Sequence, residues 1–141
     1  THMAFGTIHE LEAAQGYRRL IALADHPILT HIVNGIVREE AIHAQFYRSV
    51  ARIELRKNEF SQKMARWIID RFWAPVGQGS LAKSRTKYTI ETLFGCEDAI
   101  EGLDKTVTQR VRGLPGFDGI TKITDVIADM AEKPKMKMET A

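Results

Sequence analysis

Two residues in the first third of the chain, Glu40 and His43, have the types and spacing of metal ligands. The sequence around them reads as a helix, and residues three positions apart on a helix project from the same face. A carboxylate and an imidazole placed in this way can bind one metal ion together. We therefore take this pair as the starting point for a candidate metal site.

The residues around this pair form an amphipathic helix with the pair on its apolar side. On a helical wheel, apolar side chains lie within about 60° of Glu40 and polar ones lie opposite. The apolar side holds Leu29, Val33, Ile36, Tyr47 and Ala51, and the polar side holds Asn34, Arg38, Gln45, Arg52 and Arg56. An ionised carboxylate in an apolar seam is costly unless it is paired, protonated or bound to a cation. The position of Glu40 thus favours a role as a metal ligand. The alternative is an ion pair with an arginine, without metal.

The preceding helix carries a second carboxylate of this kind, Glu10. The face of this helix that carries Glu10 is otherwise lined by Ala13, Ala14, Tyr17, Leu20, Ile21 and Ala24. Glu12 and Arg19 are expected to lie on the opposite face, in solvent. A break at Asp25-His26-Pro27 makes the two helices antiparallel neighbours. Glu10 and Glu40 then lie at similar heights, so we expect Glu10, Glu40 and His43 to form one ligand cluster.

Two tyrosines, Tyr17 and Tyr47, lie on the same faces as the presumed ligands, one or two turns away. Either hydroxyl could hydrogen-bond a ligand and orient it. The alternative is that both are amphipathic core residues.

The rest of the sequence predicts further helices and no strand. Apolar periodicity, caps and Pro or Gly breaks place helices at 7–24, 27–57, 59–73, 87–94, 97–111 and about 120–130. We expect the third helix to bury Phe60, Met64, Trp67 and Ile68, and Phe72 to belong to the core as well. The predicted fold is all-α: a long antiparallel helix hairpin followed by shorter C-terminal helices.

The domain organisation expected from this pattern is simple. Residues 4–131 form a single helical domain, and residues 132–141 form a frayed tail. Thr1-His2-Met3 resembles residues left by a cloning vector, which leaves open whether the chain is a fragment of a longer protein.

The composition excludes several classes of protein. Of the 141 residues, 44% are hydrophobic and 27% are charged, and the net charge is +2. This balance does not favour a nucleic-acid partner, and no apolar run approaches the ~18 residues of a membrane span. Cys96 is the only cysteine, so an internal disulfide is excluded and a cytoplasmic location is expected.

The segment from Glu10 to Tyr47 resembles the second helix pair of the ferritin-like superfamily of carboxylate-bridged di-iron proteins. Within that superfamily it is most similar to the acyl-carrier-protein desaturase-like branch, whose last ligand helix reads Ile-Ala-x-Asp/Glu-Glu-x-x-His. Here Glu39 takes the Asp/Glu place, Glu40 that of the bridging carboxylate and His43 that of the imidazole ligand. Glu10 takes the place of the lone Glu on the preceding helix. Residues 71–77 also look like the segment that follows this pair in some bacterial relatives.

The resemblance implies a ferritin-like bundle, or half of one, and a pair of iron or manganese ions. It also implies oxygen activation by an oxidoreductase that acts on a small molecule, such as an acyl chain, or on iron itself. A complete site needs another Glu and another Glu-x-x-His, and no histidine follows His43. The missing half must come from a second copy in a homodimer, or from N-terminal helices of a longer protein. The alternative is a non-catalytic helical module for dimerisation or docking.

Overall fold

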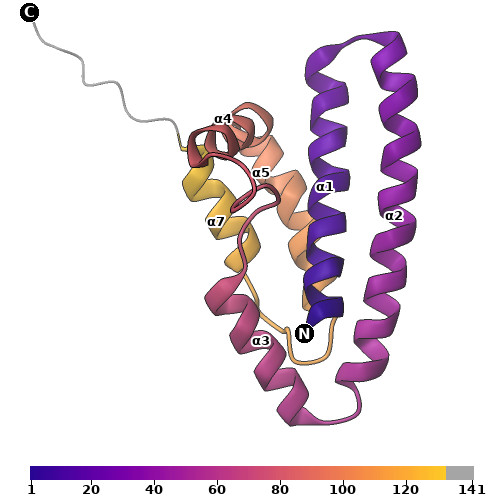
Figure 1. Ribbon diagram of the computed structural model, residues 1–141, viewed down its shortest axis with the longest axis vertical. Coiled ribbons are helices and arrows are strands. Elements are labelled where there is room, and N and C mark those ends of the chain that lie inside the picture. The colour runs from indigo at the N-terminus through magenta and orange to yellow at the C-terminus, as the bar shows by residue number, and fades with distance from the viewer. Residues whose placement is uncertain (133–141) are drawn as a thin grey trace, which may run out of the picture.

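The chain is helical through most of residues 1–132, the part that the computed structural model describes, and that part contains no strand (Figure 1). The predicted all-α class is therefore confirmed. The helices are α1 (His2–Ala24), α2 (Pro27–Leu55), α3 (Glu59–Phe72), α4 (Lys83–Phe94), α5 (Glu97–Leu103), α6 (Gln109–Arg112) and α7 (Lys122–Ala131), with a π-helical turn at Asp104–Thr108. None of them is both long and apolar enough to cross a membrane. The predicted frayed tail falls outside the described residues except for Glu132.

The two longest helices, α1 and α2, lie side by side as the predicted antiparallel hairpin (Figure 1). The turn between them is determined locally. Asp25 ends α1 in a left-handed conformation with φ 43°. The imidazole Nδ1 of His26 accepts a hydrogen bond from the backbone N–H of Leu29, and Pro27 occupies the first turn of α2. The turn therefore sets the register between the two helices.

Helix α1 begins at His2 rather than at Thr7. Met3 packs against the core and its carbonyl accepts a hydrogen bond of 2.8 Å from the Thr7 hydroxyl, while Ala4 is buried. The residues set aside as a vector remnant thus take part in the first helix of the fold.

The C-terminal helices cover one side of α1 and supply most of the core. Leu103, Val107 and Val111, which recur at helical spacing within the predicted 97–111 helix, are all fully buried. From α7, Ile123 and Ile127 pack into the same core. These contacts fix α1 between α2 and the C-terminal helices (Figure 1).

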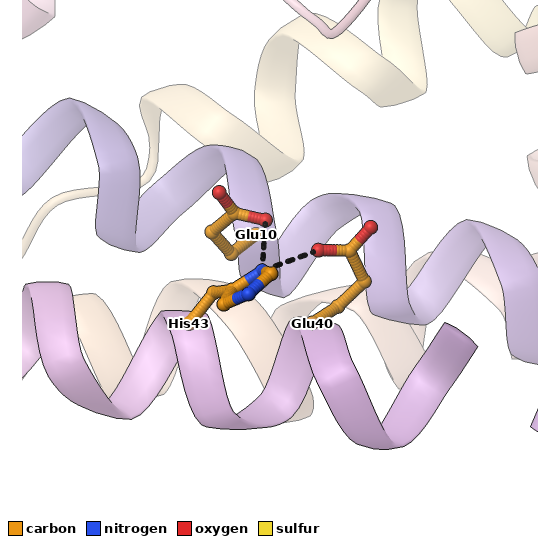
Figure 2. Close-up of side chains that lie close together, drawn as sticks. All are labelled: Glu10, Glu40 and His43. Carbon is orange, nitrogen blue, oxygen red and sulfur yellow. Dashed lines mark hydrogen bonds and ion pairs between the residues drawn. The ribbon is translucent and has the colours of Figure 1, made fainter. Parts of the chain in front are cut away.

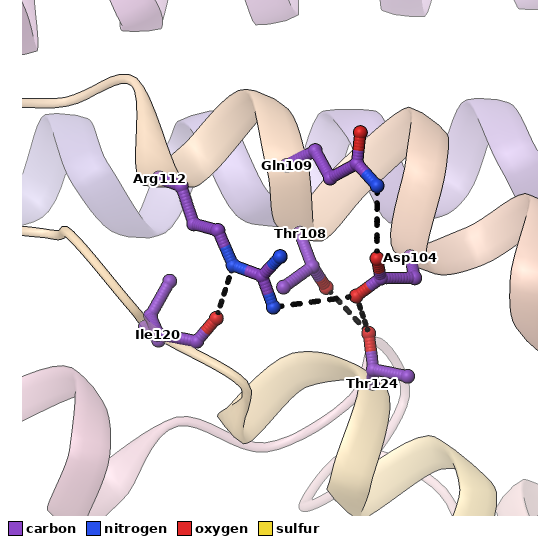
Figure 3. Close-up of polar contacts among 6 residues, drawn as sticks. All are labelled: Asp104, Thr108, Gln109, Arg112, Ile120 and Thr124. Carbon is purple, nitrogen blue, oxygen red and sulfur yellow. Dashed lines mark hydrogen bonds and ion pairs between the residues drawn. The ribbon is translucent and has the colours of Figure 1, made fainter.

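A polar network holds the π-helical turn against α7 (Figure 3). The carboxylate of Asp104 accepts hydrogen bonds from Thr124 at 3.0 Å and from Gln109 at 3.1 Å, and lies 3.6 Å from the Arg112 guanidinium. The same Thr124 hydroxyl is 2.7 Å from that of Thr108. The side chains of Asp104 and Thr108 in the π-helical turn are therefore both paired with Thr124 of α7.

Helix α3 buries a different face from the predicted one. Phe60, Trp67 and Phe72 are exposed by 59% or more and Met64 by 40%, whereas Ala65 and Ile69 are fully buried. The prediction for the aromatic residues is wrong because two apolar stripes run along this helix. The stripe that contains Ala65 and Ile69 joins the core cluster, while the aromatic stripe remains on the outside.

Two residues of α1 that were expected in solvent are also placed differently. Glu12 is only 6% exposed, and its Oε1 accepts a hydrogen bond of 3.1 Å from the backbone N–H of Val76. Arg19 is half-buried and donates to the carbonyl of Leu93 at 2.9 Å. The prediction was wrong because α4 and the segment before it cover this face of α1. The prediction considered only α1 and α2, which leave this face exposed.

We expect Glu12→Gln to stabilise the protein increasingly as pH rises. Burial raises the pKa of the Glu12 carboxyl from 4.5 to about 8, although the hydrogen bond from Val76 acts against this. The folded state therefore holds a proton that the unfolded chain has released, so this carboxyl lowers stability as pH rises from 4.5 to 8. In urea titrations, the difference in unfolding free energy between the variant and the wild type should grow by up to about 1.4 kcal/mol per pH unit. A difference that is the same at pH 5 and pH 8 would contradict this account, and Glu101→Gln, at an exposed carboxylate, is the control.

The Asp104 network gives a second prediction. Asp104→Ala leaves the Thr124 hydroxyl and the Arg112 guanidinium without their carboxylate partner, which costs about 1 to 3 kcal/mol of unfolding free energy. Urea unfolding followed by circular dichroism measures this loss. Asp129→Ala removes an exposed carboxylate of α7 and should change stability by less than about 0.5 kcal/mol. Equal effects of the two substitutions would argue against a structural role for the network.

Candidate metal centre

The hairpin brings Glu10, Glu40 and His43 together, as the sequence predicted (Figure 2). His43 Nδ1 lies 3.3 Å from Glu40 Oε2 and 3.9 Å from Glu10 Oε2. Glu40 and His43 come from adjacent turns of α2, and Glu10 reaches them from α1. The three side chains thus converge on the space between the two helices.

The spacing of these atoms is close to what one metal ion needs. One ligand atom from each residue lies within 4.8 Å of the other two. Metal–ligand bonds of about 2.1 Å place two ligands on the same ion at most ~4.2 Å apart. No separation therefore has to close by more than about 0.6 Å, which a small side-chain rotation can supply. Carboxylate oxygens and an imidazole nitrogen suit iron or manganese.

The electrostatics of the cluster favour a cation. The pKa of the Glu10 carboxyl is raised from 4.5 to about 7, mainly by burial and also by a hydrogen bond with Glu40 and the negative charge of Glu40, while the contribution of His43 lowers it. The negative charge of Glu40 makes ionisation of Glu10 costly, so Glu10 keeps its proton to a higher pH than an exposed carboxyl does. A bound cation can replace this proton and pair with both carboxylates.

The cluster lies at the edge of the fold rather than in its centre. The Glu10 and Glu40 side chains are 24% and 19% exposed, whereas that of His43 is 57% exposed. His43 is thus more accessible than its place in an apolar stripe predicted. In the described chain, the side of α2 beyond His43 has no helix packed against it (Figure 1).

The two tyrosines lie near the cluster but do not hydrogen-bond it within the described residues. Tyr17 lines the same groove as Glu10 and Glu40. The Tyr47 ring lies over Gly6 of α1, where an added Cβ would come within 2.6 Å of the ring. Gly6 therefore allows the close contact of the two helices beside the site, and the orienting role predicted for the tyrosines stays a prediction.

A groove of about 490 Å³ runs along the cluster, with walls that the sequence did not indicate. Phe72 and residues 74–78 form one side of it, and His9 lies in it with Nε2 3.3 Å from the carbonyl of Ala74. On the helical wheel His9 lies about 100° from Glu10, which gives no sign of this contact. No local signal could have placed it here, because the opposite wall comes from a distant part of the chain.

The cluster has no counterpart in residues 1–132. Glu10, Glu40 and His43 form the one group of three or more His, Cys, Asp or Glu side chains there that is close enough to hold an ion. The structure therefore places three candidate ligands together, half of the set that the resemblance implies.

Known proteins provide no family for this chain: no family model, no curated protein and no solved structure matches it. The ferritin-like assignment therefore depends on the residues between Glu10 and Tyr47 and stays a prediction.

We expect binding of Mn²⁺ to weaken as pH falls below 7, because the metal must displace the proton of Glu10. The apparent affinity should fall about fivefold between pH 7 and pH 6 and approach a tenfold loss for each further pH unit in calorimetric titrations. Glu10→Gln should weaken binding at pH 7.5 by tenfold or more and reduce the dependence on pH. Glu54→Gln changes an exposed carboxylate of α2 that pairs with Lys57. It should leave the affinity for Mn²⁺ and its dependence on pH unchanged. Wild-type affinity in Glu10→Gln would exclude Glu10 as a ligand.

Proposed function

We propose that this chain carries half of a carboxylate-bridged di-metal centre, with iron or manganese as the metal, in an oxygen-activating oxidoreductase. The observation that supports this most directly is the convergence of Glu10, Glu40 and His43 between two antiparallel helices. Two such sets would supply four carboxylates and two imidazoles, a ligand set used by helical-bundle di-iron and di-manganese proteins.

Each residue has a distinct part in this proposal. Glu10, Glu40 and His43 would hold the metal, and the resemblance assigns to Glu40 the place of the bridging carboxylate. The bound metal pair would supply the redox chemistry with dioxygen. The protein would contribute the positions of the three residues and a groove wall that includes the apolar side chains of Phe72, Val76 and Ala13.

The second half of the site needs a second helix pair, and the surface of α2 is suited to receive one. Large apolar side chains of α2 are 56% to 68% exposed: Ile28, Ile32, Ile42, Phe46 and Ile53. We call these five residues the open face. A soluble domain rarely leaves so many such side chains on one helix uncovered. A second copy, or helices of a longer form of the protein, would cover the open face and bring further carboxylates to the exposed edge of His43.

The same open face supports a second candidate, a helical dimerisation or docking module without metal. In that case Glu40 and His43 are a charged pair at an interface. Removing a buried charged pair often leaves stability unchanged or raises it. The two candidates therefore differ in whether Glu10, Glu40 and His43 bind a metal. Both need a second helix pair as partner.

Metal analysis and mass measurement on the same sample test the proposal. After anaerobic reconstitution with Fe²⁺, we expect about one iron per chain and a species of twice the 16.0 kDa chain mass. His43→Ala and Glu40→Ala should each lose most of the metal, whereas Glu54→Ala should retain it. Oxygen uptake on mixing with air should follow the metal content.

The other outcomes separate the candidates. Less than a tenth of an iron or manganese per chain in every species would overturn the metal proposal. A metal-free dimer whose stability does not fall in Glu40→Ala supports the docking module instead. A monomer that still binds one metal ion would mean that the second half does not come from a second copy.

A further inference from the structure

A second cavity, of about 400 Å³, lies between α1 and α4. Its walls are mostly carbon, from residues that include Ala13, Gly16, Leu20, Ile90 and Leu93. The two helices come close at Gly16, where an added Cβ would lie 3.6 Å from Leu93 Cδ1. Cavities of this size and character commonly bind small, mainly apolar molecules.

One carboxyl group interrupts this apolar wall. Glu12 lines the cavity and is 94% buried, and its Oε1 is paired with the backbone N–H of Val76. Its other oxygen, Oε2, is buried and has no hydrogen-bond partner. Buried polar atoms are nearly always paired in native proteins, so an unpaired one beside a cavity points to a missing partner.

We propose that this cavity binds a neutral, mainly apolar molecule with one hydroxyl group, which pairs with Glu12 Oε2 when the carboxyl, enclosed behind the cavity wall, turns toward the cavity. A hydroxyl can both donate and accept a hydrogen bond, so it suits this oxygen whether or not the carboxyl is protonated. An anion is disfavoured because it would lie beside this carboxyl, and a cation would lose its water among carbon atoms with only Glu12 to pair with. The apolar body of the ligand lies between Gly16 of α1 and Leu93 of α4.

The cavity adjoins the groove of the candidate metal centre. Ala13, Tyr17 and Val76 line both. A ligand in the cavity would therefore lie next to the groove of Glu10 and Glu40. The proposal does not depend on the metal centre, and its test uses metal-free protein.

The probes are 4-phenyl-1-butanol and butylbenzene, which differ by the hydroxyl group. Titration of ¹⁵N-labelled protein, followed by backbone amide NMR, measures affinity and location together. We expect saturable shifts at Gly16, Leu93 and their neighbours, with the alcohol binding at least tenfold more tightly than butylbenzene. Shifts confined to Ile42, Phe46 and the rest of the open face would overturn the proposal, as would the absence of saturable binding.

Three variants test the two contacts. Gly16→Leu fills the cavity and should weaken binding of both probes tenfold or more. Gly35→Leu makes the same change on α2, where an added Cβ meets nothing within 4 Å, and should bind as wild type does. Glu12→Leu should weaken the alcohol tenfold and leave butylbenzene unchanged or tighter. Wild-type binding in Gly16→Leu excludes the cavity, and equal loss of both probes in Glu12→Leu excludes the hydroxyl contact; amide spectra of the free variants verify that each is folded.

Discussion

The packing of α1 along α2 is the constraint on which the rest of the structure depends. The turn at Asp25 and Pro27 sets the register of this pair, and that register decides whether Glu10 meets Glu40 and His43. Small residues allow the helices to approach, as Gly6 does under the Tyr47 ring. A shift by one turn would move Glu10 by about 5.4 Å and separate the cluster. The candidate metal site is thus a direct consequence of helix packing.

Helix α1 also gives two nearby carboxyl groups different surroundings. Glu10 lies at the edge of the hairpin with a second carboxylate beside it, whereas Glu12 points into the interior under α4 and has the Val76 amide as its partner. Residues two positions apart on a helix, such as Glu10 and Glu12, point in directions that differ by about 200°. They therefore face different parts of the protein. Burial raises the pKa of both carboxyls, but only Glu10 has companions able to share a metal ion.

Most of the helical architecture could be predicted from sequence because it depends on local interactions. Periodic apolar residues, the Pro27 start and the break after Phe72 are properties of short segments, and the structure agrees with them closely. The cluster could also be predicted, since Glu40 and His43 are on one helix and a short turn leaves Glu10 few alternative positions. These steps require only helix geometry and one antiparallel contact.

The sequence by itself determined the helices, the hairpin and the three residues that meet between α1 and α2. Only the tertiary structure decided which side of each helix is covered. It buried Glu12 under α4, left Trp67 on the outside and exposed His43 at the edge. The physical reason is that periodicity shows where apolar side chains lie on a helix, but burial depends on which distant segment packs against them. The open face of α2 remains uncovered because no segment within residues 1–132 packs against it.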